Sequence, residues 1–283
     1  MTRIARADID GDTWLCRLDD SDALHPLVRE LPLPGADALR VLLAEEADLA
    51  TEPATHDPVP LSAATLLAPL KAPQKILAIG LNYADHARES NLEPPAAPVT
   101  FVKTPNSLLD PDTDIVVTAG TTDELDWEVE LAAVIGRRVR DVSEDDALDA
   151  VLGYTICNDV SARDAQFADG QWVRGKSFDG FCPLGPWILT TDEVPDPQTL
   201  AIRSRVNGET MQDATTKEMI FSVAYLVSYL SRFMTLEPGD VIATGTPFGV
   251  GFARTPPVYL RDGDVVECEV EHLGVLRNTV RFR

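Results

Sequence analysis

Polar and apolar residues alternate from Asp126 to Leu131, and this period of two is typical of a β-strand with one buried face. Side chains two positions apart on a strand point to the same side, so we expect Glu128 and Glu130 to share one face. The apolar residues of the run then fill the opposite face. A second strand is predicted from Tyr154 to Asn158, and a third acid, Asp159, follows it directly. If both runs are strands, the three carboxylates can converge.

Two segments with helical spacing interrupt the strands. The run from Ser143 to Leu152 begins with a good N-cap, has three acids in its first turn and carries an apolar stripe, which predicts a helix. The run from Ser222 to Met234 has apolar residues at helical spacing, and a Pro-Gly pair ends it four residues later. Near the N-terminus, the pattern predicts a strand pair that includes Thr13 to Arg17, and a helix near Ala36 to Ala47.

A change in composition divides the chain. The segment from Glu52 to Pro73 carries five prolines, which suits an extended linker that runs over a surface. Beyond it the pattern is rich in strands, with regular turn signals. We therefore place a domain boundary near residue 71, with a small N-terminal domain and its linker in residues 1–70 and a larger domain in residues 71–283. The predicted fold class is α+β, mostly β.

Charge and composition exclude several classes of protein. The 283 residues include 46 Asp and Glu against 24 Lys and Arg, a formal net charge of −22. Nucleic acids and anionic membranes require a basic surface, so we expect neither as a partner. The sequence has no apolar run of roughly 18 residues and no signal-like N-terminus, which favours a cytoplasmic location. The four cysteines form no C-x-x-C pair and are expected to be reduced and buried.

The three converging acids suggest a metal site. Glu128, Glu130 and Asp159 are all carboxylates, and ligation by oxygen alone favours Mg²⁺, Mn²⁺ or Ca²⁺ over zinc. The alternative is a half-buried strand whose polar face is only solvated.

A candidate acid–base pair lies in the stretch after a predicted strand at residues 76–79. His86 and Glu89 are three residues apart, which places them on one face of a helix, where the carboxylate can orient the imidazole. The alternative is a surface His with an incidental neighbour. Lys176 stands out because the chain has few lysines, and a cation beside bound metal can hold a substrate carboxylate or stabilise an enolate. Its alternative role is an ion pair with one of the same acids.

Other polar residues follow the same strand ends. Arg163 and Gln166 lie on a short amphipathic segment after Asp159. The run from Thr244 to Gly251 is a glycine-rich loop, but it lacks the Gly-Lys-Ser/Thr ending of a phosphate loop, so nucleotide binding is not indicated. Its backbone N–H groups and the Thr246 hydroxyl could hold a carboxylate.

Taken together, these residues resemble the fumarylacetoacetate hydrolase family, in the subgroup with a small N-terminal domain, over about residues 71–283. The matching segments are Asn82–Glu89, Phe101–Lys103, Glu128 and Glu130, Asn158–Asp164, Gly175–Ser177, Met219–Ser222 and Thr244–Gly251. The resemblance implies a mixed β-sandwich roll, a homodimer, and Mg²⁺ or Mn²⁺ held by Glu128, Glu130 and Asp159. It also implies catalytic roles for His86, Glu89 and Lys176, and substrate contacts at Arg163, Gln166, Thr246 and Tyr83.

The resemblance suggests a metal-dependent hydrolase that cleaves a C–C bond in a 2,4-dioxo acid, such as an acylpyruvate or a 2,4-diketo-3-deoxy sugar acid, to pyruvate and a carboxylic acid. His86, oriented by Glu89, would activate water, and Lys176 would help to stabilise the enolate that leaves. One alternative is an oxaloacetate decarboxylase, or an oxo-acid isomerase or dehydratase, with the same metal–enolate site. Another is a non-catalytic fold that binds an oxo acid. In each case the partner is a small oxo acid.

Overall fold

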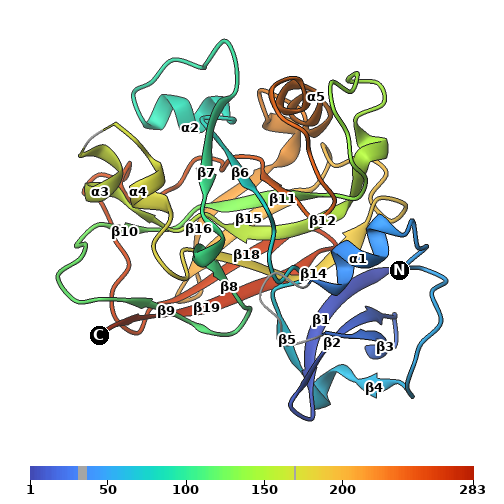
Figure 1. Ribbon diagram of the computed structural model, residues 1–283. Helices are drawn as coiled ribbons and strands as arrows, with labels where there is room; N and C mark the ends of the chain where they lie inside the picture. The colour runs from blue at the N-terminus through green and yellow to red at the C-terminus, as the bar shows by residue number, and fades with distance from the viewer. Residues whose placement is uncertain (31–36, 169) are drawn as a thin grey trace.

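The computed structural model describes residues 1–30, 37–168 and 170–283 (Figure 1). Two β-sheets dominate it, and the larger one runs through the whole molecule. In spatial order its main strands are β4 (Val59–Pro60), β3 (Ala23–Arg29), β2 (Asp12–Leu18), β1 (Arg3–Ile9), β14 (Cys182–Thr190), β12 (Val151–Asn158), β11 (Val129–Ile135), β17 (Val241–Ala243), β6 (Ile76–Gly80) and β7 (Val99–Lys103). Two short strands pair off this path, β5 (Thr65–Leu67) with β1 and β8 (Leu108–Leu109) with β14.

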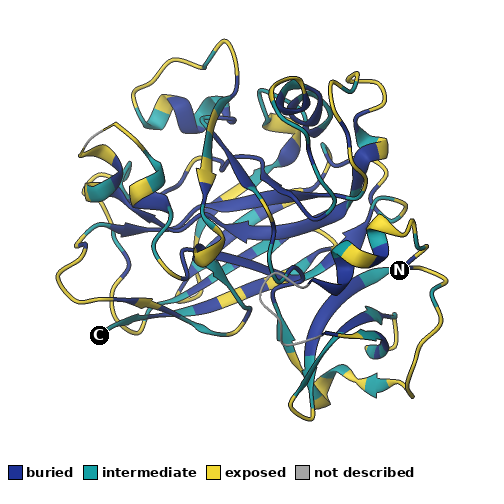
Figure 2. Cartoon of the chain, in the orientation of Figure 1, coloured by how far each residue is buried: buried dark blue, intermediate teal, exposed yellow. Residues whose placement is uncertain are grey.

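A five-stranded sheet packs against the central strands. Its order is β16 (Glu209–Thr215), β15 (Ala201–Val206), β18 (Val265–Val270), β19 (Gly274–Phe282) and β9 (Asp114–Val117). The main hydrophobic core lies between the two sheets, and β11 is buried along its full length, with alternate residues in two different core clusters. Figure 2 shows this buried centre in dark blue. The α+β, mostly β fold predicted from the sequence is therefore confirmed.

Five α-helices lie around these sheets in the described parts of the chain. They are α1 (Ala38–Ala44), α2 (Ala84–Glu89), α3 (Arg163–Phe167), α4 (Val173–Lys176) and α5 (Val223–Phe233). Short 3₁₀ turns lie at Leu61–Ala63, Pro105–Ser107, Leu148–Ala150 and Thr216–Glu218. A two-stranded ribbon of β10 (Leu125–Asp126) and β13 (Ser161–Ala162) completes the secondary structure. No helix in these described ranges is long and apolar enough to cross a membrane.

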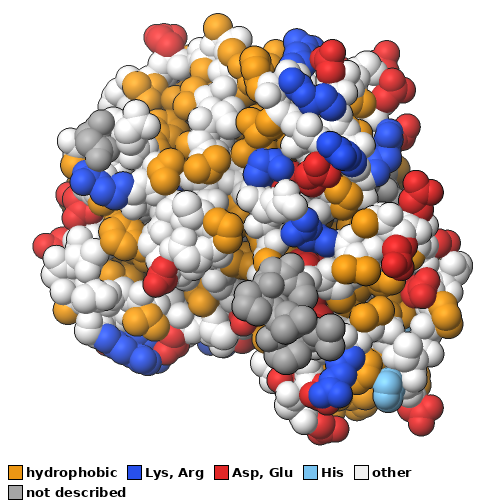
Figure 3. All heavy atoms as spheres, in the orientation of Figure 1, with side chains coloured by type: hydrophobic (Ala, Val, Ile, Leu, Met, Phe, Trp, Pro, Cys, Tyr) orange, Lys and Arg blue, Asp and Glu red, His pale blue; other side chains and the backbone are white. Residues whose placement is uncertain are grey.

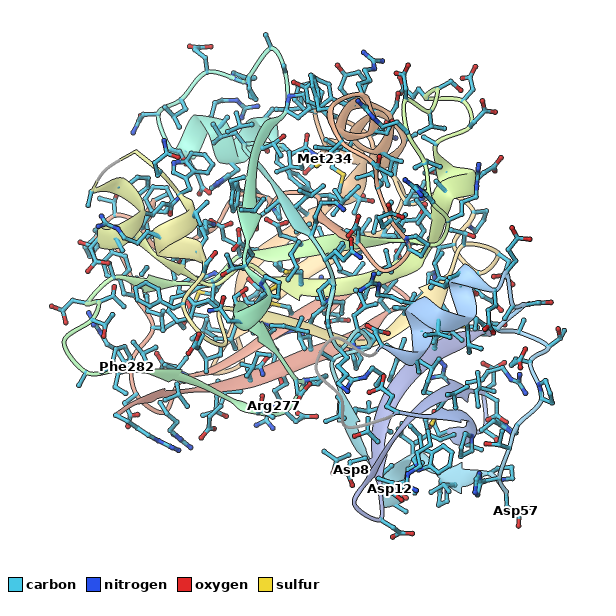
Figure 4. All side chains as sticks on the ribbon, in the orientation of Figure 1. Asp8, Asp12, Asp57, Met234, Arg277 and Phe282 are labelled. Atoms are coloured by element: carbon cyan, nitrogen blue, oxygen red, sulfur yellow. The ribbon has the colours of Figure 1, made fainter. Side chains whose placement is uncertain are left out.

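The helix predicted after Ser222 is confirmed. Ser222 is its N-cap, and the Ser222 hydroxyl accepts a hydrogen bond from the backbone N–H of Tyr225 at 3.1 Å. The buried side of α5 packs into the main core through Leu226, Val227 and Leu230. Met234, labelled in Figure 4, follows the helix directly and packs against the same core.

The helix predicted from Ser143 to Leu152 is wrong. The capping contact itself exists, because the backbone N–H of Asp146 donates to the Ser143 hydroxyl at 3.2 Å, but only turns and a 3₁₀ segment follow it. Val151 already pairs with Ile135 in the large sheet. Pairing with β11 therefore overrides a local helical pattern whose last apolar residues are strand residues.

The N-terminal segment joins the large sheet directly. Strand β1 pairs with β14, with Ile4 opposite Ile188, and the predicted strand at Thr13–Arg17 forms part of β2. The helix predicted near residues 36–47 corresponds to α1, and its expected start at Ala36 lies outside the described residues. The proline-rich segment is largely exposed up to residue 60 but then forms β5, which pairs with β1. The boundary near residue 71 stays a prediction.

On the face shown in Figure 3, acidic and basic side chains lie near one another, most of them toward the rim of the view. In Figure 4 the labelled acids Asp8, Asp12 and Asp57 lie on the N-terminal unit, on the opposite side of the molecule from α2 and α3. The four cysteines are buried and free, as expected from their spacing.

Candidate active site

Three carboxylates converge where β11 begins and β12 ends. These strands are antiparallel, with Val129 opposite Asn158, so the start of one lies beside the end of the other. Glu128, Glu130 and Asp159 each offer an oxygen within 4.8 Å of the others, and all three residues are buried. The predicted convergence is therefore confirmed, and the alternative of a solvated polar face is wrong.

The run from Asp126 to Leu131 is not one continuous strand. Asp126 ends β10, Trp127 and Glu128 have no strand pairing, and β11 starts at Val129. The break occurs because the Asn158 side chain accepts the Glu128 N–H at 3.1 Å, and the Gln212 side chain accepts the Val129 N–H at 3.1 Å. Side-chain acceptors thus replace the sheet ladder at this point.

Buried cations surround the three acids. The Lys176 ammonium lies 2.8 Å from Glu128 Oε2 and 2.8 Å from Asp159 Oδ2. The Lys103 ammonium is fully buried and lies 2.5 Å from Asp159 Oδ1. On the other side of Glu128, Arg163 Nη2 lies 2.6 Å from Oε1. Glu128 and Asp159 are therefore each bound by two cations.

The neighbouring cations shift the pKa of Glu128 and of Glu130 differently. Burial alone would raise the pKa of Glu128, but the charges of Lys176 and Arg163 outweigh it and lower that pKa to about 2. At Glu130, burial together with the charges of Asp159 and Glu128 raises the pKa well above its usual range. One backbone N–H, that of Gly245, donates to Glu130 Oε2 at 2.9 Å. Glu130 is thus the acid that lacks a cation.

A divalent cation fits this donor set. The buried cluster holds four carboxylates against three cations, which leaves one negative charge when all of them are ionised. An ion among oxygen ligands would supply the positive charge that Glu130 lacks and would leave the site net positive, ready for an anionic substrate. The members of the cluster are Asp126, Glu128, Glu130 and Asp159, with Lys103, Arg163 and Lys176.

The contact predicted between His86 and Glu89 is present. Both residues lie on α2, and His86 Nδ1 lies 2.7 Å from Glu89 Oε1. Glu89 is held in turn by the glycine-rich loop, because the Gly249 N–H donates to both of its carboxylate oxygens at 3.1 and 2.9 Å. A carboxylate at Nδ1 favours a proton on that nitrogen, which leaves Nε2 as the nitrogen that can exchange a proton with a ligand. His86 is buried but lines the cavity described below.

Arg163 and Gln166 are fixed beside the acids by α3. The Arg163 side chain donates to Asp126 Oδ2 at 2.8 Å and to Gln166 Oε1 at 2.9 Å, and its guanidinium lies 4.4 Å from the centre of the Phe252 ring. Both residues line the cavity. They are therefore placed to meet a ligand, although the arginine is already paired.

Thr246 and Tyr83 have different surroundings. The Thr246 hydroxyl donates to the Val129 carbonyl at 2.9 Å and accepts from Gln212 at 2.7 Å, so its proton is already used within the protein. Thr246 lines the cavity all the same. Tyr83 is buried at the N-cap of α2 and is not among the cavity-lining residues. Burial and the charge of Glu130 raise the pKa of Tyr83. The substrate contact expected of Tyr83 stays a prediction.

The residues meet around a cavity of about 230 Å³. Small-molecule pockets usually occupy roughly 300–1,000 Å³, so this one suits a small ligand. Its polar part consists of His86, Ser90, Glu128, Arg163, Gln166, Lys176 and Thr246. The rest of the lining is glycine or apolar, namely Ile79, Gly80, Leu81, Leu92, Phe101, Phe167, Trp172 and Phe252.

Three residues of the site could not be assigned from the sequence. Lys103 matched the family pattern, but nothing in the pattern pairs it with Asp159, which lies 56 positions later. Asp126 belongs to the alternating run, yet its role is to hold Arg163 and to accept the Gly251 N–H at 2.7 Å. Asn82 lies in a matching segment with no chemistry of its own to signal a role. Each contact joins segments distant in sequence, so only the fold brings them together.

Asn82 links three chain segments next to the site through side-chain hydrogen bonds. Its side-chain amide donates to the carbonyls of Phe221 and Thr244 at 3.0 and 2.7 Å, and its oxygen accepts the Phe221 N–H at 2.8 Å. Replacing Asn82 by alanine should lower the free energy of unfolding by about 3 kcal/mol, because buried backbone groups lose their partners. Denaturant unfolding measures this, with the exposed Gln74→Ala as control. A loss no larger than the control's would contradict this role.

Comparison with known proteins places the chain in a family. Residues 75–281 match the family described as fumarylacetoacetate (FAA) hydrolase C-terminal. The chain belongs to the fumarylacetoacetate hydrolase family. The family assignment suggested by the sequence is thus confirmed, and the family consists of enzymes.

Several curated relatives share nearly half of the aligned sequence. The mitochondrial oxaloacetate tautomerase FAHD2A of Bos taurus is 49% identical over 230 residues, which cover 80% of this chain and 73% of that protein. The Homo sapiens protein of the same name is 48% identical over 224 residues, covering 78% of this chain and 71% of its own length.

Solved structures match over the full chain. A fumarylacetoacetate hydrolase from Exiguobacterium antarcticum has a TM-score of 0.85 and 40% identity, with 100% of both chains covered. A 2-hydroxyhepta-2,4-diene-1,7-dioate isomerase from Mycobacterium marinum has a TM-score of 0.81 and 36% identity, covering 100% of this chain and 99% of the other. Within one family the names thus include a tautomerase, a hydrolase and an isomerase, so the family alone does not fix the reaction.

Proposed function

We propose that this protein is a tautomerase of 2-oxo acids that interconverts the keto and enol forms, with oxaloacetate as the first substrate to test. The observation that carries the proposal is the 49% identity, over 80% of the chain, to a protein named oxaloacetate tautomerase. The proposed cofactor is Mg²⁺ or Mn²⁺ at Glu128, Glu130 and Asp159. This changes the order of the functions suggested by the sequence, in which C–C hydrolysis came first.

The buried residues support a proton transfer at carbon. In the ketonisation of oxaloacetate, the O–H bond of the enol breaks and a C–H bond forms at C3, so the reaction needs no other reactant. Nε2 of His86 can accept or return the C3 proton, while Glu89 holds the imidazole in place through Nδ1. A divalent cation held by Glu128, Glu130 and Asp159 would supply stabilisation of the negative charge that develops on the 2-oxo oxygen.

The neighbouring cations suit the substrate's carboxylates. Lys176 and Arg163 both line the cavity, and each already pairs with Glu128. An added positive charge in the cluster would leave them free to share their protons with a bound anion. The homodimer and the cytoplasmic location remain proposals that follow from the family resemblance and the sequence.

Hydrolysis of a 2,4-dioxo acid is the second candidate function. It is supported by the 0.85 TM-score to a protein named fumarylacetoacetate hydrolase, and by a His–Glu pair that could activate water instead of a carbon acid. Both reactions pass through an enol or enolate, so the same ionic residues serve either one.

The two functions separate in one assay. Purified protein with Mg²⁺ receives freshly dissolved enol oxaloacetate, and loss of the enol absorbance is followed while pyruvate and CO₂ are measured in parallel. We expect the enol to disappear in proportion to enzyme concentration, well above the rate with Mg²⁺ alone, without matching release of pyruvate. If the enol decays at the background rate while an acylpyruvate is cleaved, hydrolysis is the function instead.

A further inference from the structure

The lining of the cavity combines two chemical kinds of side chain. Its charged members include Arg163 and Lys176, which both contact Glu128. Among the described lining residues these two are the only Lys or Arg side chains, and both touch the same carboxylate. A carboxylate on the distant end of a long substrate would therefore meet no cation of its own. A dicarboxylate too long to place both carboxylates beside these two cations is poorly suited to this cavity.

Two aromatic pairs supply much of the apolar lining. Phe101 and Trp172 meet edge to face with ring centres 5.4 Å apart, and Phe167 and Phe252 lie 5.6 Å apart. Leu92, which lines the same cavity, is 49% exposed. Such rings offer large apolar area and prefer edge-to-face or tilted contacts with another ring.

Two of the aromatic rings also contact the cations of the cavity lining. Arg163 lies over Phe252 at 4.4 Å, and the Lys176 ammonium lies 5.4 Å from the centre of the Phe101 ring. Each cation that lines the cavity thus rests against an aromatic ring, which excludes water from one side of it. The aromatic wall therefore begins directly beside the groups that would hold the reacting end of a substrate.

A glycine makes room for the largest of these rings. Gly80 ends β6, and a Cβ added there would lie 2.2 Å from an atom of the Trp172 ring. Any other residue at this position would displace the indole from the cavity wall. The position of Trp172 therefore depends on the backbone of the central sheet as well as on its own loop.

From these features we propose that the substrates preferred by this site are 2-oxo acids that carry an aryl group on C3. The inference rests on the proposed function and specifies its substrate class. The carboxylate and 2-oxo group lie beside Arg163 and Lys176, and the aryl group packs against the aromatic residues Phe101, Trp172, Phe167 and Phe252. The reaction is the same isomerisation: the enol O–H bond breaks, a C3–H bond forms, and nothing is oxidised or reduced.

The test compares two enols in one enzyme. Ketonisation of enol phenylpyruvate and of enol oxaloacetate is followed with the Mg²⁺-loaded full chain, and kcat/KM is measured for each. We expect phenylpyruvate to have the higher kcat/KM. Phe167→Ala should then lower kcat/KM for phenylpyruvate about tenfold, mainly through KM, which is in the range for one lost apolar contact. Oxaloacetate should lose much less efficiency than phenylpyruvate, because it has no aryl group to pack against Phe167.

The variant is chosen to leave the fold and the ionic residues intact. Phe167 is 54% exposed and touches none of the proposed proton-transfer groups. Phe233→Ala is the matched control, because Phe233 is 63% exposed on α5 and does not line the cavity. Phe167→Leu should recover most of the lost efficiency through its apolar volume.

The outcomes separate this inference from the function on which it rests. If the enzyme ketonises oxaloacetate but prefers it to phenylpyruvate, or if Phe167→Ala affects both substrates equally, the aryl preference is overturned and the tautomerase stands. If neither enol reacts faster than with Mg²⁺ alone, the proposed function fails and the substrate class fails with it.

Discussion

Glu130→Gln is expected to weaken Mn²⁺ binding by at least about 100-fold, since loss of a mere outer-shell partner already costs roughly 10–100-fold. Glu130 is the acid with no cation beside it, and its neighbours raise its pKa well above the usual range. Glutamine keeps the shape and can still accept the Gly245 N–H, but it brings no charge. Calorimetric titration with Mn²⁺ measures the affinity directly, without reference to activity.

The same variant should keep its fold. Removing a buried, uncompensated carboxylate relieves repulsion from Glu128 and Asp159, so the melting temperature of the metal-free variant should equal or exceed that of the parent protein. Glu209→Gln, at an exposed position on β16, provides the matched control. Unchanged Mn²⁺ affinity in Glu130→Gln would refute the assignment of the metal site.

His86→Ala is expected to lower kcat for enol ketonisation by about 10² to 10⁴, the usual contribution of a positioned general base. KM should change little, because the cations that face the substrate's carboxylate are untouched. Glu89→Gln should cause a smaller loss, since it acts through the orientation of the imidazole. Steady-state kinetics on the enol of oxaloacetate gives both parameters.

Chemical rescue distinguishes a lost base from a distorted site. The alanine variant leaves an opening in the cavity wall where the imidazole lay, so added imidazole should restore part of the activity. His272→Ala, on the surface and remote from the cavity, should match the parent protein. Parent-like kcat in His86→Ala would remove this residue from the mechanism.

The sequence predicted which side chains meet better than it predicted the elements that carry them. Glu128 and Glu130 could be paired by spacing because residues two apart tend to stay on one side even where the strand is broken at Trp127. His86 and Glu89 could be paired because one helical turn is a local geometry. Such short-range relations survive errors in the assignment of elements.

Apart from the convergence of Asp159 with Glu128 and Glu130, long-range contacts were beyond the reach of the same reasoning. The segment after Ser143 has the right N-cap and its capping contact. Val151 nevertheless pairs with Ile135 of β11 and so belongs to the sheet. Lys103 and Asp126 act through partners that are 56 and 37 positions away, and no local pattern encodes those distances. A sequence shows which groups are available, whereas register and burial decide which of them meet.

The pairing of β1 with β14 gives the N-terminal segment a structural role that is separate from catalysis. No described residue before Ile79 lines the cavity, so this unit supplies nothing to the reaction directly. It does cover the edge of β14 at Ile188 and Leu189, where a bare strand would present unpaired N–H and C=O groups next to apolar side chains. Strand β1 thus occupies a strand edge through which the catalytic sheet could otherwise pair with a second chain.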